Sequence, residues 1–312
     1  MRQPARRPVA ALALAALLVL AGCSVAAPTT DERTATLTPA PVPGGGGAGT
    51  VASGADAGGQ RSADGRRLAP GLRAGGVDDT FALAGAHGAS LASRSYTRGD
   101  SRTVVDGNGT LQATRTDLRV GAGGEPFLLE RSAVSAPRYD VQLPYSEAVV
   151  HHDGRHAAYR VVTNGSVRHR VDGNAPPAEV LPDRTGRNAV LGLLSAFEWE
   201  VQELEIGGEP HYRLESTALR APEALDDAYL LSDPRNASVR LLVGTDGRVH
   251  RYRLEYETSY DGRTVGVTET ARWSAVGETA VPEPDWLGTA RNATERSSAA
   301  EQPGRVVGLP GV

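Results

Sequence analysis

Six glycine-containing turn sequences divide the chain from Ser95 onward into short segments, and this series constrains the fold more than any other feature. They are Asp106-Gly107-Asn108-Gly109, Asp153-Gly154, Asn164-Gly165, Gly207-Gly208, Asp246-Gly247 and Asp261-Gly262. Asn-Gly and Asp-Gly accept the positive φ angles of tight turns, whose twist matches that of antiparallel strands. The series therefore predicts an antiparallel meander.

The segments between these turns alternate in polarity with a period of two, most clearly at 249–260 and 263–276. In the first segment one face carries His250, Tyr252, Leu254, Tyr256, Thr258 and Tyr260, and the other is mainly charged. Val265, Val267, Ala271 and Trp273 continue the apolar face, as do Tyr159 with Val161 and Tyr212 with Leu214. Such alternation is typical of strands with one covered and one solvated face. It predicts one large sheet.

Helical segments are expected to cover the apolar face of this sheet. Residues 187–197 carry an apolar stripe formed by Val190, Leu191, Leu193, Leu194 and Phe197. A second helix is expected from Val77, with Phe81, Leu83, Ala84, His87 and Leu91 on its covered face and His87 partly buried rather than a metal ligand. A short third helix is expected at 222–231. Helices on one side of an antiparallel sheet define an α+β fold.

The N-terminus has the features of an export signal. Arg2, Arg6 and Arg7 precede an apolar run from Val9 to Ala21, which at thirteen residues is too short to cross a membrane. We therefore predict a signal peptide at 1–22. The arginine pair leaves general secretion and twin-arginine export both open.

Four regions follow from the composition. After the signal, residues 23–67 are rich in Thr, Pro, Ala, Gly and Ser without apolar periodicity, and are expected to form a disordered stalk. Residues 68–290 form the predicted folded domain, and 291–312 the predicted disordered tail.

Without the signal the chain has 30 basic and 37 acidic residues, a net charge of −7, which disfavours nucleic-acid binding. Its single cysteine excludes intrachain disulfides.

Few motifs indicate chemistry. Asn-X-Ser/Thr sequons occur at Asn108, Asn164, Asn236 and Asn292. They are either N-glycosylation sites or asparagines that serve turn geometry and are followed by Ser or Thr by coincidence. His151, His152 and His156 flank one turn without a complete ligand set, so no metal site is predicted. Arg98, Arg102, Arg115 and Arg119 form either an anion-binding patch or a solvated sheet face. No hydrolase elbow, zinc-protease motif or phosphate-binding loop is present, which predicts a non-enzymatic protein without a cofactor.

Leu20-Ala21-Gly22-Cys23 resembles the lipobox of prokaryotic lipoproteins, which implies that Cys23 carries a lipid anchor on the outer face of the cell membrane. The alternative is an ordinary secretory signal with a chance cysteine. The stalk, Pro70-Gly71-Leu72, Ser95-Tyr96-Thr97 and the closing Val281-Pro282-Glu283-Pro284-Asp285-Trp286 resemble haloarchaeal surface lipoproteins. The layout is more distantly similar to the lipoprotein-carrier (LolA) and LppX-type half-barrels. That resemblance implies a curved antiparallel sheet that wraps helices on its concave face and holds acyl chains.

Two functions follow as hypotheses. In the first, the protein binds lipid or another hydrophobic molecule in a cavity lined by Tyr159, Tyr212, Leu214, Tyr252, Leu254, Tyr256 and Trp273. The same residues equally suit a packed core. In the second, the protein is a cell-envelope scaffold with a filled core and an exposed apolar patch as its interaction surface.

Overall fold

The computed structural model describes residues 65–225 and 231–301, which form an α+β structure built on one large sheet. The predicted signal peptide, Cys23 and the stalk up to residue 64 lie outside the described residues, as do residues 302–312 of the tail.

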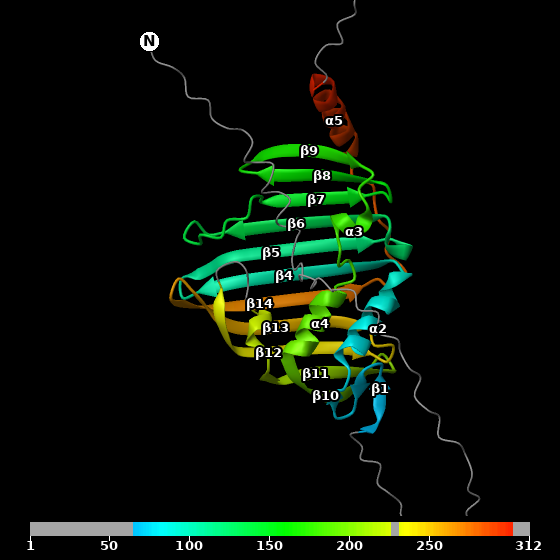
Figure 1. Cartoon of the computed structure of the whole chain (residues 1–312), viewed down its shortest axis with the longest axis vertical. Helices are drawn as coiled ribbons and strands as arrows, with labels where there is room; N and C mark the ends of the chain where they lie inside the picture. The colour runs from blue at the N-terminus through cyan, green and yellow to red at the C-terminus, as the bar shows by residue number, and fades with distance from the viewer. Residues whose placement is uncertain (1–64, 226–230, 302–312) are drawn as a thin grey trace, which may run out of the picture. The chain divides into compact units, whose positions relative to one another are not determined.

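Helices and strands follow one another in the order shown in Figure 1. The strands are β1 (Arg67–Ala69), β2 (Leu72–Arg73), β3 (Gly76–Val77), β4 (Tyr96–Asp106), β5 (Gly109–Val120), β6 (Phe127–Ser135), β7 (Glu147–His152), β8 (His156–Thr163), β9 (Ser166–Gly173), β10 (Phe197–Ile206), β11 (Glu209–Leu219), β12 (Ser232–Gly244), β13 (Val249–Tyr260) and β14 (Arg263–Ser274). The helices are α2 (Thr80–Ala92), α3 (Pro177–Val180), α4 (Arg187–Ala196) and α5 (Leu287–Glu301), with short 3₁₀ turns η3 (Ala122–Gly124) and η4 (Pro222–Leu225).

The large sheet has eleven antiparallel strands in the order β10-β11-β12-β13-β14-β4-β5-β6-β7-β8-β9. Each of the six predicted turn sequences joins two paired strands, so the predicted meander is confirmed. Strands β14 and β4 form the one neighbouring pair that is not consecutive in the sequence. Strands β9 and β10 lie at opposite edges, and the connection between them, which contains α3 and α4, passes over one face of the sheet (Figure 1).

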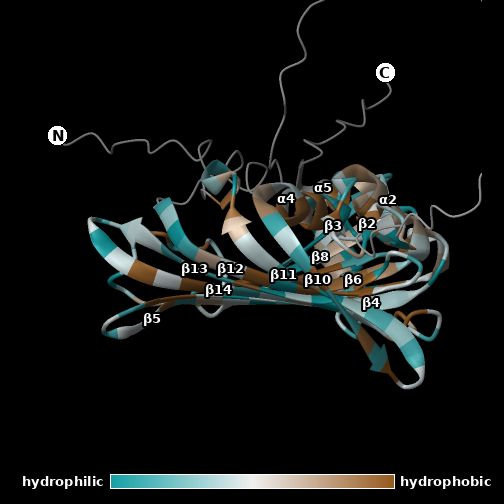
Figure 2. Ribbon diagram, turned by 90° about the horizontal axis from the view of Figure 1, so that it is seen from below, coloured by the Kyte–Doolittle hydropathy of each residue, from teal (hydrophilic) through white to brown (hydrophobic). Residues whose placement is uncertain are grey.

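The sheet is curved, and α2 and α4 lie on its concave side, which we call the inner face (Figure 2). The predicted helix at 187–197 is confirmed as α4, although Phe197 is already the first residue of β10. The predicted helix after Val77 is confirmed as α2, whose first turn is capped because the Asp79 carboxylate accepts the Ala82 N–H at 2.8 Å. Phe81 was expected on the covered side of this helix, but its side chain faces solvent and is 66% exposed.

The C-terminal end of the described chain differs from the expected disordered tail. Residues 287–301 form α5, which packs against the edge strand β9 and extends beyond it (Figure 1). Leu287 and Ala290 are buried, and the Thr294 hydroxyl accepts the N–H of Val171 on β9 at 2.9 Å. Packing against an edge strand therefore supports a helix that its polar sequence does not predict. It also covers part of an edge that would otherwise offer unpaired backbone groups.

The expected helix at 222–231 is present only as the 3₁₀ turn η4, and 226–230 lie outside the described residues. No helix within the described ranges combines the length and the apolar character needed to cross a membrane.

Candidate functional site

The structure brings six of the seven predicted cavity residues together beneath the helices. Tyr212 and Leu214 lie on β11, Tyr252, Leu254 and Tyr256 on β13, and Trp273 on β14, all in the main core and none more than 9% exposed. The buried side of α4 contributes Val190, Leu193 and Leu194 to the same core. These six residues therefore already contact protein, and a ligand would reach them only if α2 or α4 moved.

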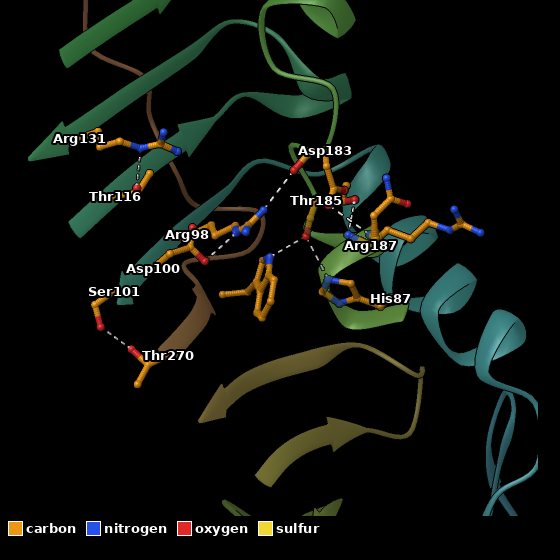
Figure 3. A network of polar contacts seen from close by, with 12 residues as sticks. His87, Arg98, Asp100, Ser101, Thr116, Arg131, Asp183, Thr185, Arg187 and Thr270 are labelled. Carbon is orange, nitrogen blue, oxygen red and sulfur yellow. Dashed lines mark hydrogen bonds and ion pairs between the residues drawn. The ribbon is translucent and has the colours of Figure 1, made fainter. Parts of the chain in front are cut away.

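A buried histidine holds the two covering helices in place (Figure 3). His87 on α2 is fully buried, and its Nε2 lies 3.0 Å from the Thr185 carbonyl oxygen just before α4. The same carbonyl accepts the Trp273 indole N–H at 2.8 Å. His87 Nδ1 accepts the Val249 N–H at 3.2 Å, which requires a neutral ring with its proton on Nε2. Burial accordingly lowers the pKa of His87 from 6.5 to about 4.

Tyr159, the seventh predicted cavity residue, lies apart from the other six on β8. It is half-buried on the inner face, in register with Val150 on β7 and, through it, with Leu129 on β6. The Arg170 guanidinium lies over its ring at 4.9 Å from the centroid. In this half of the sheet the inner face is less completely covered than under α2 and α4 (Figure 1).

The neighbouring row of the same face runs from Arg131 on β6 through Ala148 on β7 to Val161 on β8. We call these two rows together the open inner patch. It consists of Leu129, Arg131, Ala148, Val150, Tyr159 and Val161, all of them half-buried. Five apolar or aromatic side chains thus surround one charged side chain on the concave side of the sheet.

Both ends of the open inner patch are closed by irregular chain. At one end, His152 Nε2 lies 2.7 Å from the Ala175 carbonyl oxygen, and its ring stacks on Phe127 at 5.1 Å. At the other end the loop 136–146 crosses the inner face, where the Asp140 N–H donates to the Tyr260 hydroxyl at 2.7 Å. A solvent-open pocket of about 300 Å³ lies under this loop, lined by Ala133, Ser135, Gln142, Leu143, Pro144, Tyr145, Ser146, Thr163, Asn164 and Gly165.

Ion pairs occupy the centre of the inner face between the helix-covered core and the open inner patch. Arg98 donates to the Asp100 carboxylate at 2.9 Å, and Arg102 donates to Glu269 at 3.0 Å. Burial raises the pKa of the Asp100 carboxyl, while Arg98 opposes that shift. Arg115 and Arg119 lie on the opposite, outer face of β5, so the four arginines considered as one patch are divided between two faces.

The remaining candidate residues are placed as follows. His151 and His152 point to opposite faces of β7, and His156 is exposed beside Asp153. The described ranges contain no group of three His, Cys, Asp or Glu side chains suited to a metal ion. All four sequon asparagines are exposed: Asn108 and Asn164 at hairpin tips, Asn236 on β12, where it donates to Glu257, and Asn292 on α5.

Sequence reasoning singled out Tyr159 and Val161 but missed Leu129, Arg131, Ala148 and Val150. Strand β6 reads Phe-Leu-Leu-Glu-Arg from Phe127 to Arg131, with apolar residues on both faces, so alternation alone does not identify its inner side. The pairing of Leu129 with Val150, and of Val150 with Tyr159, is what assigns the face.

No protein-family model matches the chain, and no curated protein matches it in sequence. Among solved structures, LprF from Mycobacterium bovis is similar over 66% of this chain and 96% of its own, with 11% identity and a TM-score of 0.34. A LolA superfamily protein from Nitrosomonas europaea is similar over 66% of this chain and 94% of its own, with 10% identity and a TM-score of 0.24. For a DUF1329 family protein from Desulfovibrio piger the coverages are 67% and 95%, the identity 12% and the TM-score 0.25. These likenesses assign no family, and the fold rests on the strand order described above.

Proposed function

We propose that this protein is an exported lipoprotein, anchored by lipidated Cys23, that binds a hydrophobic molecule on its open inner patch without catalysing a reaction. The observation that carries the proposal is the partial exposure of apolar side chains on the concave face of β6–β8, where no helix buries them fully. Concave, mainly apolar surfaces with a few polar groups are the usual sites for small ligands. The helix-covered half of the sheet supplies the rigid core.

The scaffold alternative gains no comparable support. It requires a contiguous exposed apolar surface. Among residues 65–225 and 231–301, the large exposed apolar side chains are Phe81, Val105, Val134, Val167 and Ile206, which belong to five different elements. We therefore place ligand binding first.

An aspartate at Val161 is expected to weaken binding of a neutral hydrophobic probe, such as N-phenylnaphthylamine, by about tenfold or more, because an apolar ligand would displace water from the new carboxylate. Binding is measured by probe fluorescence with the purified full chain. Val167→Asp is the matched control, since Val167 lies on the same hairpin but on the outer face and is 48% exposed.

Circular dichroism checks that both variants remain folded. Equal affinities for the probe in Val161→Asp and Val167→Asp would rule out the open inner patch as the binding surface and would favour the scaffold hypothesis.

Replacement of Cys23 by serine is expected to release the protein from the membrane fraction of an exporting prokaryotic host, because serine has no thiol to carry the lipid. Fractionation and immunoblotting measure the change, with Ser24→Ala as the control. Retention of Cys23→Ser in the membrane at the wild-type level would show that the anchor is not this cysteine.

A further inference from the structure

Arg131 is the one charged residue of the open inner patch. Within β6 it follows Leu129 by two residues, so both side chains are on the inner face, and its register partners are Ala148 and, beyond it, Val161. Arg131 is half-buried in these surroundings. Placing a charge there is unfavourable unless it has partners.

The partners of Arg131 in the structure are neutral. Its Nε donates to the Thr116 hydroxyl at 3.1 Å (Figure 3). One terminal nitrogen donates to the Tyr145 hydroxyl at 3.4 Å. Arg98 and Arg102 on the same face each have a carboxylate within 3.0 Å. Among the described residues no carboxylate forms an ion pair with Arg131 by direct contact. The Asp100 carboxylate in the same register row pairs with Arg98 and interacts with Arg131 only at longer range.

The inner face around this residue has an excess of positive charge. Strands β14 and β4–β9 direct Arg98, Arg102, Arg131, Arg168 and Arg170 to that face, against Asp100, Asp172 and Glu269. Arg170 and Arg168 stand exposed on the edge strand β9, in register with Tyr159 and Val161 respectively, so they continue the two rows of the patch. An anion entering the open inner patch therefore meets favourable charge at its rim and at its centre.

We propose that the ligand is an amphiphile with an acidic head group, and that Arg131 binds this group as the specificity-determining residue. This inference rests on the proposed function and names its ligand class. The guanidinium offers paired N–H donors that match a carboxylate or a phosphate, and the Tyr145 hydroxyl beside it is a further donor. The acyl chain then lies over Leu129, Val150, Tyr159 and Val161.

The test compares ligands that share one chain and differ in the head group. Oleate, oleoyl lysophosphatidate and neutral oleyl alcohol displace N-phenylnaphthylamine from the full chain at a concentration below their aggregation limits. The wild type is expected to bind at least one of the two acids about ten to a hundred times more tightly than the alcohol, as charge-assisted hydrogen bonds imply. Which acid binds more tightly distinguishes a fatty acid from a phospholipid source.

Arg131→Gln is expected to remove most of this preference, leaving only the few-fold contribution of the rim arginines, while oleyl alcohol still binds as in the wild type, which also shows that the variant is folded. Arg115→Gln is the matched control, because Arg115 pairs with Asp117 on the outer face. An unchanged preference in Arg131→Gln overturns the head-group assignment but leaves hydrophobic binding intact. Failure of the wild type to bind any of the three ligands overturns the proposed function and this inference with it.

Discussion

Replacing Gly71 with alanine is expected to lower the free energy of unfolding by about 3 kcal/mol or more, through left-handed backbone strain plus overpacking. Gly71 has a φ of +70°, and an added Cβ would lie 2.1 Å from the Asp79 carbonyl oxygen and 2.8 Å from the Leu83 nitrogen. Its own carbonyl accepts the N–H groups of Asp78 and Asp79. The turn between β1 and β2 is thus packed directly onto the start of α2, with no room for a side chain.

Gly165→Ala is the control that separates these two contributions. Gly165 has nearly the same φ, +75°, at the tip of the β8–β9 hairpin, but no atom would lie within 4 Å of an added Cβ. Only the backbone strain remains there, so a loss of about 1 kcal/mol is expected. Urea unfolding curves of both full-length variants give the two values. Equal losses would contradict the close packing of Gly71 on α2.

Acidification is expected to destabilise the domain by about 3 kcal/mol through His87 alone, since one pKa unit corresponds to about 1.4 kcal/mol. The pKa of His87 is about 4 in the folded protein and 6.5 ordinarily, so the unfolded chain takes up the proton more readily. The contribution is complete above pH 6.5 and is lost as the pH falls from 6.5 towards 4. Protonation removes the acceptor at Nδ1 that binds the Val249 N–H.

The measurement is the free energy of unfolding at several pH values for the wild type and His87→Gln, whose neutral amide has no such titration. The loss on acidification should be smaller in the variant by about the amount assigned to His87. Burial also lowers the pKa of His250 to about 4, but that contribution is present in both proteins and cancels. His156→Gln, at an exposed position, serves as the control. Identical pH profiles for wild type and His87→Gln would contradict the buried neutral histidine.

The sheet was predictable from the sequence because the features that specify its turns and its covering helix lie within short stretches of the chain. Asn164-Gly165 and Asp261-Gly262 specify their own turns through positive φ angles, and α4 carries its apolar stripe within ten residues. Helix α5 was not predictable in this way. Its sequence is polar, and its support comes from β9, through buried Ala290 and the bond from Val171 to Thr294.

The candidate site was only partly predictable, because it depends on where the helices lie over the sheet. Alternation identifies Tyr159 and Tyr252 as residues on a covered face with equal strength. What distinguishes them is the path of the helices. Tyr252 is buried in the half of the sheet that α2 and α4 cover (Figure 1), whereas Tyr159 in the other half is only half-buried. Arg131 has no local signature at all, as its importance lies in the neutral neighbours that two other strands and a loop place around it.

The single non-consecutive strand pair has a consequence for how the chain reaches its structure. Strands β4–β9 and β10–β14 are two runs of hairpins, each able to assemble from contacts close in sequence, which favours fast folding. The pair β14–β4 joins residues such as Ser101 and Thr270, which are 169 positions apart, and its formation must overcome the entropy of closing that loop. The centre of the finished sheet is therefore the last part of it that we expect to form. Until then both halves expose an unpaired strand edge, where a second copy of the chain can pair instead.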